Sequence, residues 1–288
     1  MKSPPPKDEL AIEKENMSWF LFGKSFWLEI GLVLSIVVLF LLAFEQDLTR
    51  WWHTPSPGKM GVGYLDENFA SSCLAERYLV RLPTSYHQKN TWPLIVFLHG
   101  SGKRGNDPKK LDKYLDFFES YWGKELPAVL VMPQCRSEQR WEADDIRALV
   151  TIIDQQYHVD SNRVYLMGSS MGGFGAWRTA AAYPDFFAAI IPISGGESID
   201  LADRLLKCLP WAFHGSSDHV VPVERTTDLV EAIRLAGGDP KLTLYPEQRH
   251  DIVGLAFSTP ELWHWLFEQN LEDRPEQVSV STTSDKEP

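Results

Sequence analysis

The sequence of 288 residues predicts an α/β domain in which helices cover both faces of a mostly parallel sheet. Short, nearly continuous apolar runs such as PLIVFL and PAVLVM alternate along the chain with longer segments of helical spacing. Strands of this composition are typical of a sheet that is buried on both faces. The alternation fills residues 63–271, which is the length of one ordinary domain.

The elements of this domain follow one another in a regular order. The predicted strands are residues 75–82, 93–98, 127–132, 163–167, 188–193, 209–213 and 241–245. The segments with helical spacing between and after them are residues 111–118, 144–157, 171–183, 223–235 and 260–269. A sheet of this kind binds its ligand at the carboxyl ends of its strands, so we expect functional residues in the loops that follow them.

An apolar segment precedes the domain. The run IGLVLSIVVLFLLAF at 30–44 contains no charge, and extension back to Phe26 gives a helix of about 28 Å, close to the thickness of a bilayer core. We expect a transmembrane helix at 26–44 that contacts membrane lipid. A cleaved signal peptide and a buried soluble helix are the alternatives, although the preceding segment 1–25 is long and mixes acidic residues with its lysines.

The flanks of this segment suggest an orientation and a linker. Four lysines precede the span, whereas only Arg50 and Lys59 follow it closely, so we expect a cytoplasmic segment 1–25 and a C-terminal domain that is periplasmic or extracellular. Residues 45–62 are expected to be a linker, because proline and glycine in HTPSPGKMGV disfavour helix and strand. Residues 272–288 contain few apolar side chains and are expected to be a disordered tail.

Composition excludes several classes of protein. The chain has 28 Lys and Arg against 39 Asp and Glu, a net charge of −11, which disfavours nucleic acid as a partner. Its three cysteines are too few and too scattered for a disulfide framework or a CxxC metal site. We therefore expect no structural metal.

The motif that carries chemistry follows the strand RVYLM. Gly168-Ser169-Ser170-Met171-Gly172 has the form G-x-S-x-G and leads into a helical segment. In this context the glycines permit a sharp turn that exposes the central serine, Ser170, whereas Ser169 lacks glycines at the required spacing. A nucleophilic serine is therefore expected at Ser170, with the N–H of Met171 as one oxyanion donor at the start of the helix.

A serine hydroxyl needs a base, and this turn is typically followed downstream by an acid and then a histidine, each after a strand. Asp218 follows the strand LPWAF in the loop HGSSDHVVP, and His250 follows KLTLY in the loop PEQRHD. The other histidines precede the serine, share the loop of the acid, or lie in a helical segment. We expect Ser170, Asp218 and His250 to be nucleophile, orienting carboxylate and general base.

The loop after LIVFLHG supplies the second expected oxyanion donor. Its glycines, Gly100 and Gly102, permit close approach of the backbone to a substrate, and the N–H of Ser101 is the expected donor. Trp141 follows the loop after the strand PAVLVM, where it either lines the acyl pocket or packs in the core.

Six motifs occur in order: LHGSGKRGND, VMPQC, RVYLMGSSMGGFGAW, AAIIPISGG, WAFHGSSDHVVP and YPEQRHD. Together they resemble the phospholipase/carboxylesterase-like branch of the α/β-hydrolase superfamily, with similarity to predicted peptidases and to feruloyl or polyhydroxybutyrate-depolymerase-like esterases. The resemblance covers about residues 75–270 and implies the α/β-hydrolase fold, the triad named above and no metal or organic cofactor. One departure is Arg249, where the family usually has glycine before the histidine.

The expected function is hydrolysis of carboxylic esters through an acyl-enzyme on Ser170. The segment between the strands at 188–193 and 209–213 is too short for a lid domain, which favours small esters or the exposed part of a polymer or peptide. A peptidase or an acyltransferase would use the same residues, and both remain alternatives. A non-catalytic binding module is a further alternative, and the sequence does not indicate an oligomeric state.

Overall fold

The computed structural model describes residue 35 and residues 55–65 and 69–274. Its contacts divide the chain between residues 54 and 55, and the fold belongs to the unit Pro55–Pro288. The expected cytoplasmic segment 1–25 and the expected membrane span 26–44, apart from residue 35, lie outside the described residues. Within the described part, no helix combines the length and apolar character needed to cross a membrane.

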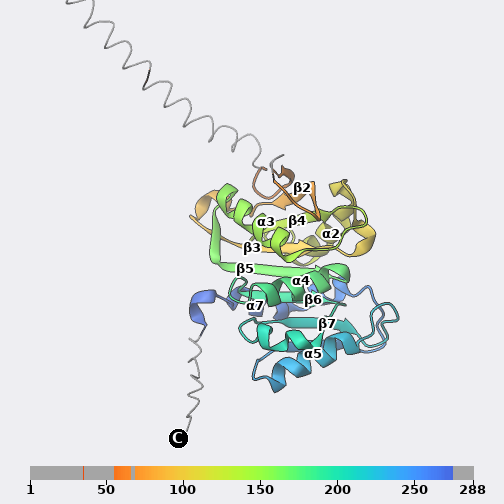
Figure 1. Ribbon diagram of the computed structural model, residues 1–288. Helices are drawn as coiled ribbons and strands as arrows, with labels where there is room; N and C mark the ends of the chain where they lie inside the picture. The colour runs from red at the N-terminus through yellow and green to blue at the C-terminus, as the bar shows by residue number, and fades with distance from the viewer. Residues whose placement is uncertain (1–34, 36–54, 66–68, 275–288) are drawn as a thin grey trace, which may run out of the picture. The chain divides into compact units, whose positions relative to one another are not determined.

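Eight strands of the described chain form one sheet in the order β1-β2-β4-β3-β5-β6-β7-β8 (Figure 1). The strands are β1 (Met60–Tyr64), β2 (Leu74–Arg81), β3 (Trp92–Leu98), β4 (Val129–Cys135), β5 (Val159–Ser169), β6 (Ala189–Ile193), β7 (Trp211–Gly215) and β8 (Lys241–Tyr245). β2 runs antiparallel to both of its neighbours, and the pairs from β4 through β8 are parallel. The predicted mostly parallel sheet is confirmed.

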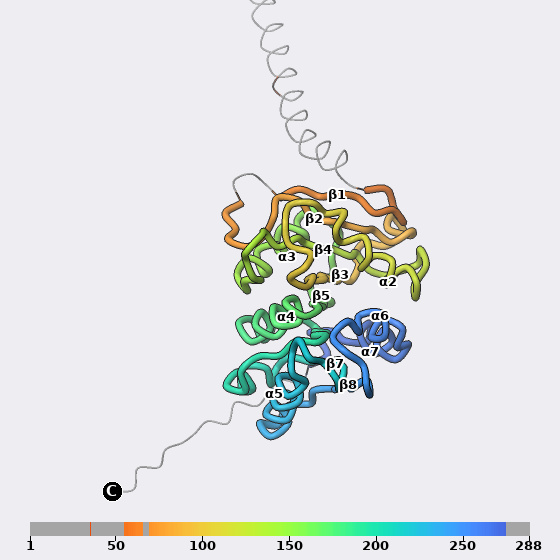
Figure 2. Tube along the Cα trace, turned by 90° about the vertical axis from the view of Figure 1, so that its right-hand side faces the viewer, coloured from red at the N-terminus to blue at the C-terminus, as the bar shows by residue number. Residues whose placement is uncertain are grey.

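Helices cover both faces of this sheet. They are α2 (Asp112–Trp122), α3 (Ala143–Gln156), α4 (Met171–Ala182), α5 (Glu224–Leu235), α6 (Val253–Phe257) and α7 (Pro260–Glu268). Buried residues of α3, α4 and α5 form one apolar core with the sheet, and those of α2, α6 and α7 form another. Figure 2 shows these two groups of helices on opposite sides of the strands. β3, β4 and β6 are buried along their whole length, which explains their continuous apolar sequences.

Short 3-10 helices connect several of these elements. They are η1 (Tyr86–Gln88), η2 (Ser101–Lys103), η3 (Pro108–Leu111), η4 (Ile199–Leu205) and η5 (Leu271–Asp273). η4 occupies the connection between β6 and β7, where no lid domain was expected. The three cysteines of the chain are buried free thiols.

The structure differs from the sequence-based expectation at both ends of the domain. Residues 60–62 of the predicted linker 45–62 belong to β1, so the domain begins before residue 63. Glycine is required at position 63 of this edge strand, because the ring of Tyr78 covers it. A Cβ on Gly63 would stand 2.2 Å from that ring. The predicted tail 272–288 begins in η5, and the Arg274 guanidinium donates to the carbonyls of Phe187 and Ala188.

Candidate active site

The residues singled out in the sequence follow parallel strands of the sheet. Ser170 comes directly after β5, Asp218 after β7 and His250 after β8. Ser101 and Trp141 lie after β3 and β4. Since the carboxyl ends of parallel strands meet at one edge, side chains that are distant in sequence converge there.

A strained turn presents Ser170 between β5 and α4. Its φ of 55° and ψ of −117° place it in a region that residues with a Cβ rarely adopt. The turn is tight, because a Cβ on Gly168 would stand 2.2 Å from the Gly172 carbonyl oxygen, and one on Gly172 would stand 1.9 Å from that of Leu98. The Ser170 N–H is tied to the Ile193 carbonyl of β6 at 2.8 Å. The glycines of G-x-S-x-G are therefore required by packing.

His250 connects the serine with the carboxylate. Its Nε2 lies 2.8 Å from Ser170 Oγ, and its Nδ1 lies 2.7 Å from Asp218 Oδ2. Because Nδ1 faces a carboxylate, it carries a hydrogen, and Nε2 is then free to accept the hydroxyl hydrogen of Ser170. The structure thus brings Ser170, His250 and Asp218 together in the order that nucleophilic catalysis requires.

Asp218 is held as an ionised carboxylate. Its side chain has no exposed surface, and Oδ1 accepts the N–H groups of Val220 at 2.8 Å and Val221 at 3.0 Å. Burial raises the pKa of this carboxyl, but hydrogen bonds from His250 and from the two backbone N–H groups outweigh it, so the pKa is lowered. The carboxylate therefore stays charged at neutral pH, where it stabilises a positive His250.

A second histidine, which sequence reasoning did not assign, contacts the same carboxylate. His214 is fully buried at the end of β7, with Nε2 3.0 Å from Asp218 Oδ2 and 3.1 Å from the Val221 carbonyl. Facing two acceptors, Nε2 carries a hydrogen. Nδ1 lies 2.7 Å from Thr226 Oγ1 of α5. His214 thus fixes the orientation of Asp218. The sequence signal for this role was the position of His214, four residues before Asp218 in HGSSD.

The two expected oxyanion donors stand at helix starts beside Ser170. Met171 is the first residue of α4, and Ser101 is the first of η2, so neither N–H has a partner within its own helix. Gly100 lies against the serine, because a Cβ there would be 3.5 Å from Ser170 Cβ, whereas a Cβ on Gly102 would meet nothing within 4 Å. Gly100 therefore lies against Ser170, and the space beside Gly102 is open.

Trp141 packs in the core, which is one of the two roles left open by the sequence. Its side chain is buried, and Nε1 donates to the His99 carbonyl at 3.0 Å. The His99 ring, 4.9 Å from that of Trp141, accepts the Cys135 N–H at Nε2, and burial lowers its pKa to about 4, so it is neutral. Trp141 also lines a pocket beside the serine.

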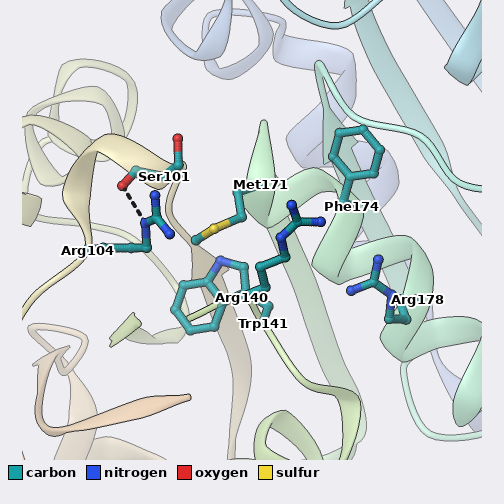
Figure 3. Close-up of a pocket in the computed structure, with 7 residues that line it drawn as sticks. All are labelled: Ser101, Arg104, Arg140, Trp141, Met171, Phe174 and Arg178. Atoms are coloured by element: carbon teal, nitrogen blue, oxygen red, sulfur yellow. Dashed lines mark hydrogen bonds between the residues drawn. The ribbon is translucent and has the colours of Figure 1, made fainter. Parts of the chain in front are cut away.

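That pocket has a volume of about 340 Å³ (Figure 3). It is lined by Ser101, Arg104, Arg140, Trp141, Met171, Phe174 and Arg178. Sequence reasoning missed Arg140, Phe174 and Arg178, although Met171, Phe174 and Arg178 share one face of α4 by their spacing. Arg249, the residue that departs from the family pattern, is exposed and is not among the lining residues.

Comparison with known families identifies the family of the chain. The Esterase family model matches residues 76–226, more than half of the chain, and this match includes Ser170 and Asp218. It ends before His250, and the assignment of all three residues rests on sequence order and on the contacts described above.

Several curated relatives and solved structures are named as esterases. "Probable acetylxylan esterase A" of Aspergillus flavus is 29% identical over 254 residues, 82% of this chain and 75% of the relative. Feruloyl esterase D of Neurospora crassa is 24% identical over 160 residues, 52% of this chain and 55% of the relative. The crystal structure of a thermostable esterase matches with a TM-score of 0.65 and 28% identity over 73% of this chain. The chain spans 63% of the length of that structure.

Proposed function

The chain belongs to the Esterase family of α/β-hydrolases, and on that premise we propose that it cleaves carboxylic esters through an acyl-enzyme on Ser170. Its class as a carboxylesterase-type hydrolase follows from the family and the relatives. The observation that carries the acyl-enzyme proposal is the position of His250, within hydrogen-bond distance of both Ser170 and Asp218.

In the first half of the reaction, Ser170 Oγ attacks the acyl carbon of the ester while His250 Nε2 accepts the hydroxyl proton. The Asp218 carboxylate stabilises the positive charge that forms on His250. The carbonyl oxygen becomes an oxyanion and accepts hydrogen bonds from the N–H groups of Met171 and Ser101. The bond to the alcohol oxygen then breaks, and that oxygen takes the proton from Nε2.

In the second half, a water molecule gives a proton to His250 Nε2 as its oxygen attacks the acyl carbon on Ser170. Collapse of the second tetrahedral intermediate returns the proton to Ser170 Oγ and releases the carboxylic acid. The exposed part of the His250 side chain, 23% of its surface, gives water access to this step.

We further propose that the substrates carry short acyl groups, on small molecules or on the exposed part of a polymer. The pocket of about 340 Å³ and the lack of a lid domain between β6 and β7 support this. The relative named as an acetylxylan esterase agrees with a short acyl group.

A series of p-nitrophenyl esters of increasing chain length tests this proposal. We expect kcat/KM to be highest for acetyl to butyryl esters, because longer chains do not fit in the pocket. Activity should disappear in Ser170→Ala, because the nucleophile is removed. A steady rise in kcat/KM beyond about ten carbons would contradict the short-acyl proposal. Hydrolysis that persists in Ser170→Ala would contradict the role of Ser170.

We also propose that the enzyme is tethered to a membrane by residues 26–44, with its N-terminus cytoplasmic and its catalytic domain periplasmic or extracellular. Support comes from the uncharged run at 30–44 and from the excess of lysine before it.

A further inference from the structure

The pocket beside Ser170 is unusual in its charge. Three of the seven residues that line it are arginines, and none is acidic. The chain as a whole carries a net charge of −11. Local positive charge in an acidic protein favours an anionic ligand at that place, because the field inside a cleft is set by the groups that line it.

The three arginines are engaged to different degrees. Arg104 donates two hydrogen bonds to backbone carbonyls. Its Nε lies 3.1 Å from the Ser101 carbonyl oxygen, and a second guanidinium nitrogen lies 3.2 Å from the Gln139 carbonyl oxygen. Arg178 binds Glu197 at 2.5 Å. Arg140 is exposed, and among the described residues it has no hydrogen-bond or ion-pair partner. Arg140 therefore has its full set of donors available to a ligand.

The pocket also has an apolar side. Trp141, Met171 and Phe174 line it together with the arginines, and Figure 3 shows Arg140 and Arg178 reaching it from different elements, the loop after β4 and helix α4. A flat or aliphatic group would fit against the apolar residues, with a charged end toward the guanidinium groups. Arg178 already holds a carboxylate, that of Glu197, and the planar guanidinium matches carboxylate geometry.

We propose that this pocket selects esters that carry a second, free carboxylate, which Arg140 binds at the edge of the site with support from the charge of Arg178. The inference rests on the proposed function, because the carboxylate is part of an ester that Ser170 attacks. The carboxylate belongs either to the acyl group or to the alcohol, and matched substrates distinguish the two.

The test compares full-length wild-type chain with Arg140→Gln, and with Arg178→Gln as a second variant. In one arm mono(4-nitrophenyl) adipate is compared with 4-nitrophenyl hexanoate, and in the other 4-acetoxybenzoate is compared with its methyl ester. The quantity measured is the ratio of kcat/KM for the anionic ester to that for the neutral one. Arg204→Gln, which removes the same charge from an exposed position outside the pocket, is the matched control.

We expect the ratio to fall about tenfold in Arg140→Gln and to stay unchanged in Arg204→Gln, because a charge-assisted hydrogen bond is lost in the first variant alone. The arm in which it falls identifies the part of the ester that carries the carboxylate. A ratio in Arg140→Gln equal to that of the wild type, in both arms, overturns the inference and leaves ester hydrolysis intact, whatever the ratio in Arg178→Gln. Failure to cleave any of the four esters overturns the proposed function and this inference with it.

Discussion

At the scale of single residues, the surroundings of Asp218 and Asp251 explain which of the two contacts His250. Asp218 is buried and receives hydrogen bonds on both oxygens, one of them from His250. Asp251 follows His250 directly, but it is 68% exposed and binds Lys113 at 3.0 Å. The carboxylate that is near in sequence is thus turned away from the histidine.

This difference predicts the effect of removing each charge. Asp218→Asn should lower kcat by about a thousandfold or more, because the amide no longer holds His250 in the required tautomer. Asp251→Asn, the matched control, should change kcat by less than about twofold. Steady-state kinetics on p-nitrophenyl acetate measures both. A larger loss in Asp251→Asn than in Asp218→Asn would show that the acid is misassigned.

A second buried aspartate contributes to stability in a way that depends on pH. Asp145 Oδ2 accepts the hydroxyls of Ser71 and Ser72 and the N–H of Cys73, at 2.8 to 2.9 Å, and so ties the chain before β2 to α3. Burial raises the pKa of this carboxyl, but these hydrogen bonds outweigh it and lower the pKa. Its contribution is therefore present above its ordinary pKa near 4 and is lost as pH falls through the lowered value.

We expect Asp145→Asn to lower the free energy of unfolding by about 1–3 kcal/mol at pH 7, and by less below pH 4. Asp154→Asn, at an exposed position of the same helix, should have little effect at either pH. Urea denaturation at pH 7 and pH 3 gives the comparison. A destabilisation that is equal at both pH values would contradict the role of the ionised carboxylate.

At the scale of elements, the pattern of apolar residues predicted the buried strands well, because a strand that is covered on both faces consists mostly of apolar residues. β8 matches its predicted range, and the other predicted strands differ at their ends by at most a few residues. The edge strand β1 was missed because a strand with one neighbour tolerates glycine and lacks a continuous apolar run. The antiparallel direction of β2 depends on contacts distant in sequence, which residue patterns do not encode.

The tight junction of β5 with α4 also belongs to this scale. We expect Gly172→Ala to lower the free energy of unfolding by at least about 3 kcal/mol, because its Cβ would overlap the Leu98 carbonyl of β3. Gly102→Ala, where a Cβ meets nothing within 4 Å, should change it by less than about 0.5 kcal/mol. Thermal and urea unfolding measure both variants. Equal stability of the two variants would contradict the proposed overlap between a Cβ at position 172 and the Leu98 carbonyl.

At the scale of the whole molecule, sequence order placed the serine, the acid and the histidine, since each follows a strand whose carboxyl end lies at the same edge of the sheet. The pocket was harder to predict. Arg140, Phe174 and Arg178 come from a loop and a helix, and their meeting depends on how α4 packs beside the loop after β4. Net charge did not help with the pocket either, because a value of −11 for the whole chain does not set the sign of one pocket.

The proposed tether is a property of the whole chain. We expect the full chain to remain in the membrane fraction after carbonate extraction, and its catalytic domain to be digested by protease added to intact spheroplasts. Val38→Asp should move protein to the soluble fraction, because a carboxylate near the middle of the span costs about 3 kcal/mol. A catalytic domain that stays protected in intact spheroplasts would contradict the orientation, and wild-type chain in the soluble fraction would contradict the tether.

The most direct test of the central claim, an activated Ser170, is labelling of the full chain with a fluorophosphonate followed by peptide mass spectrometry. We predict one phosphonyl group on Ser170 of the wild-type chain, no label in Ser170→Ala, and strongly slowed labelling in His250→Ala, because the histidine accepts the serine proton. Label on Ser169, or a folded wild-type chain that does not react, would contradict the account.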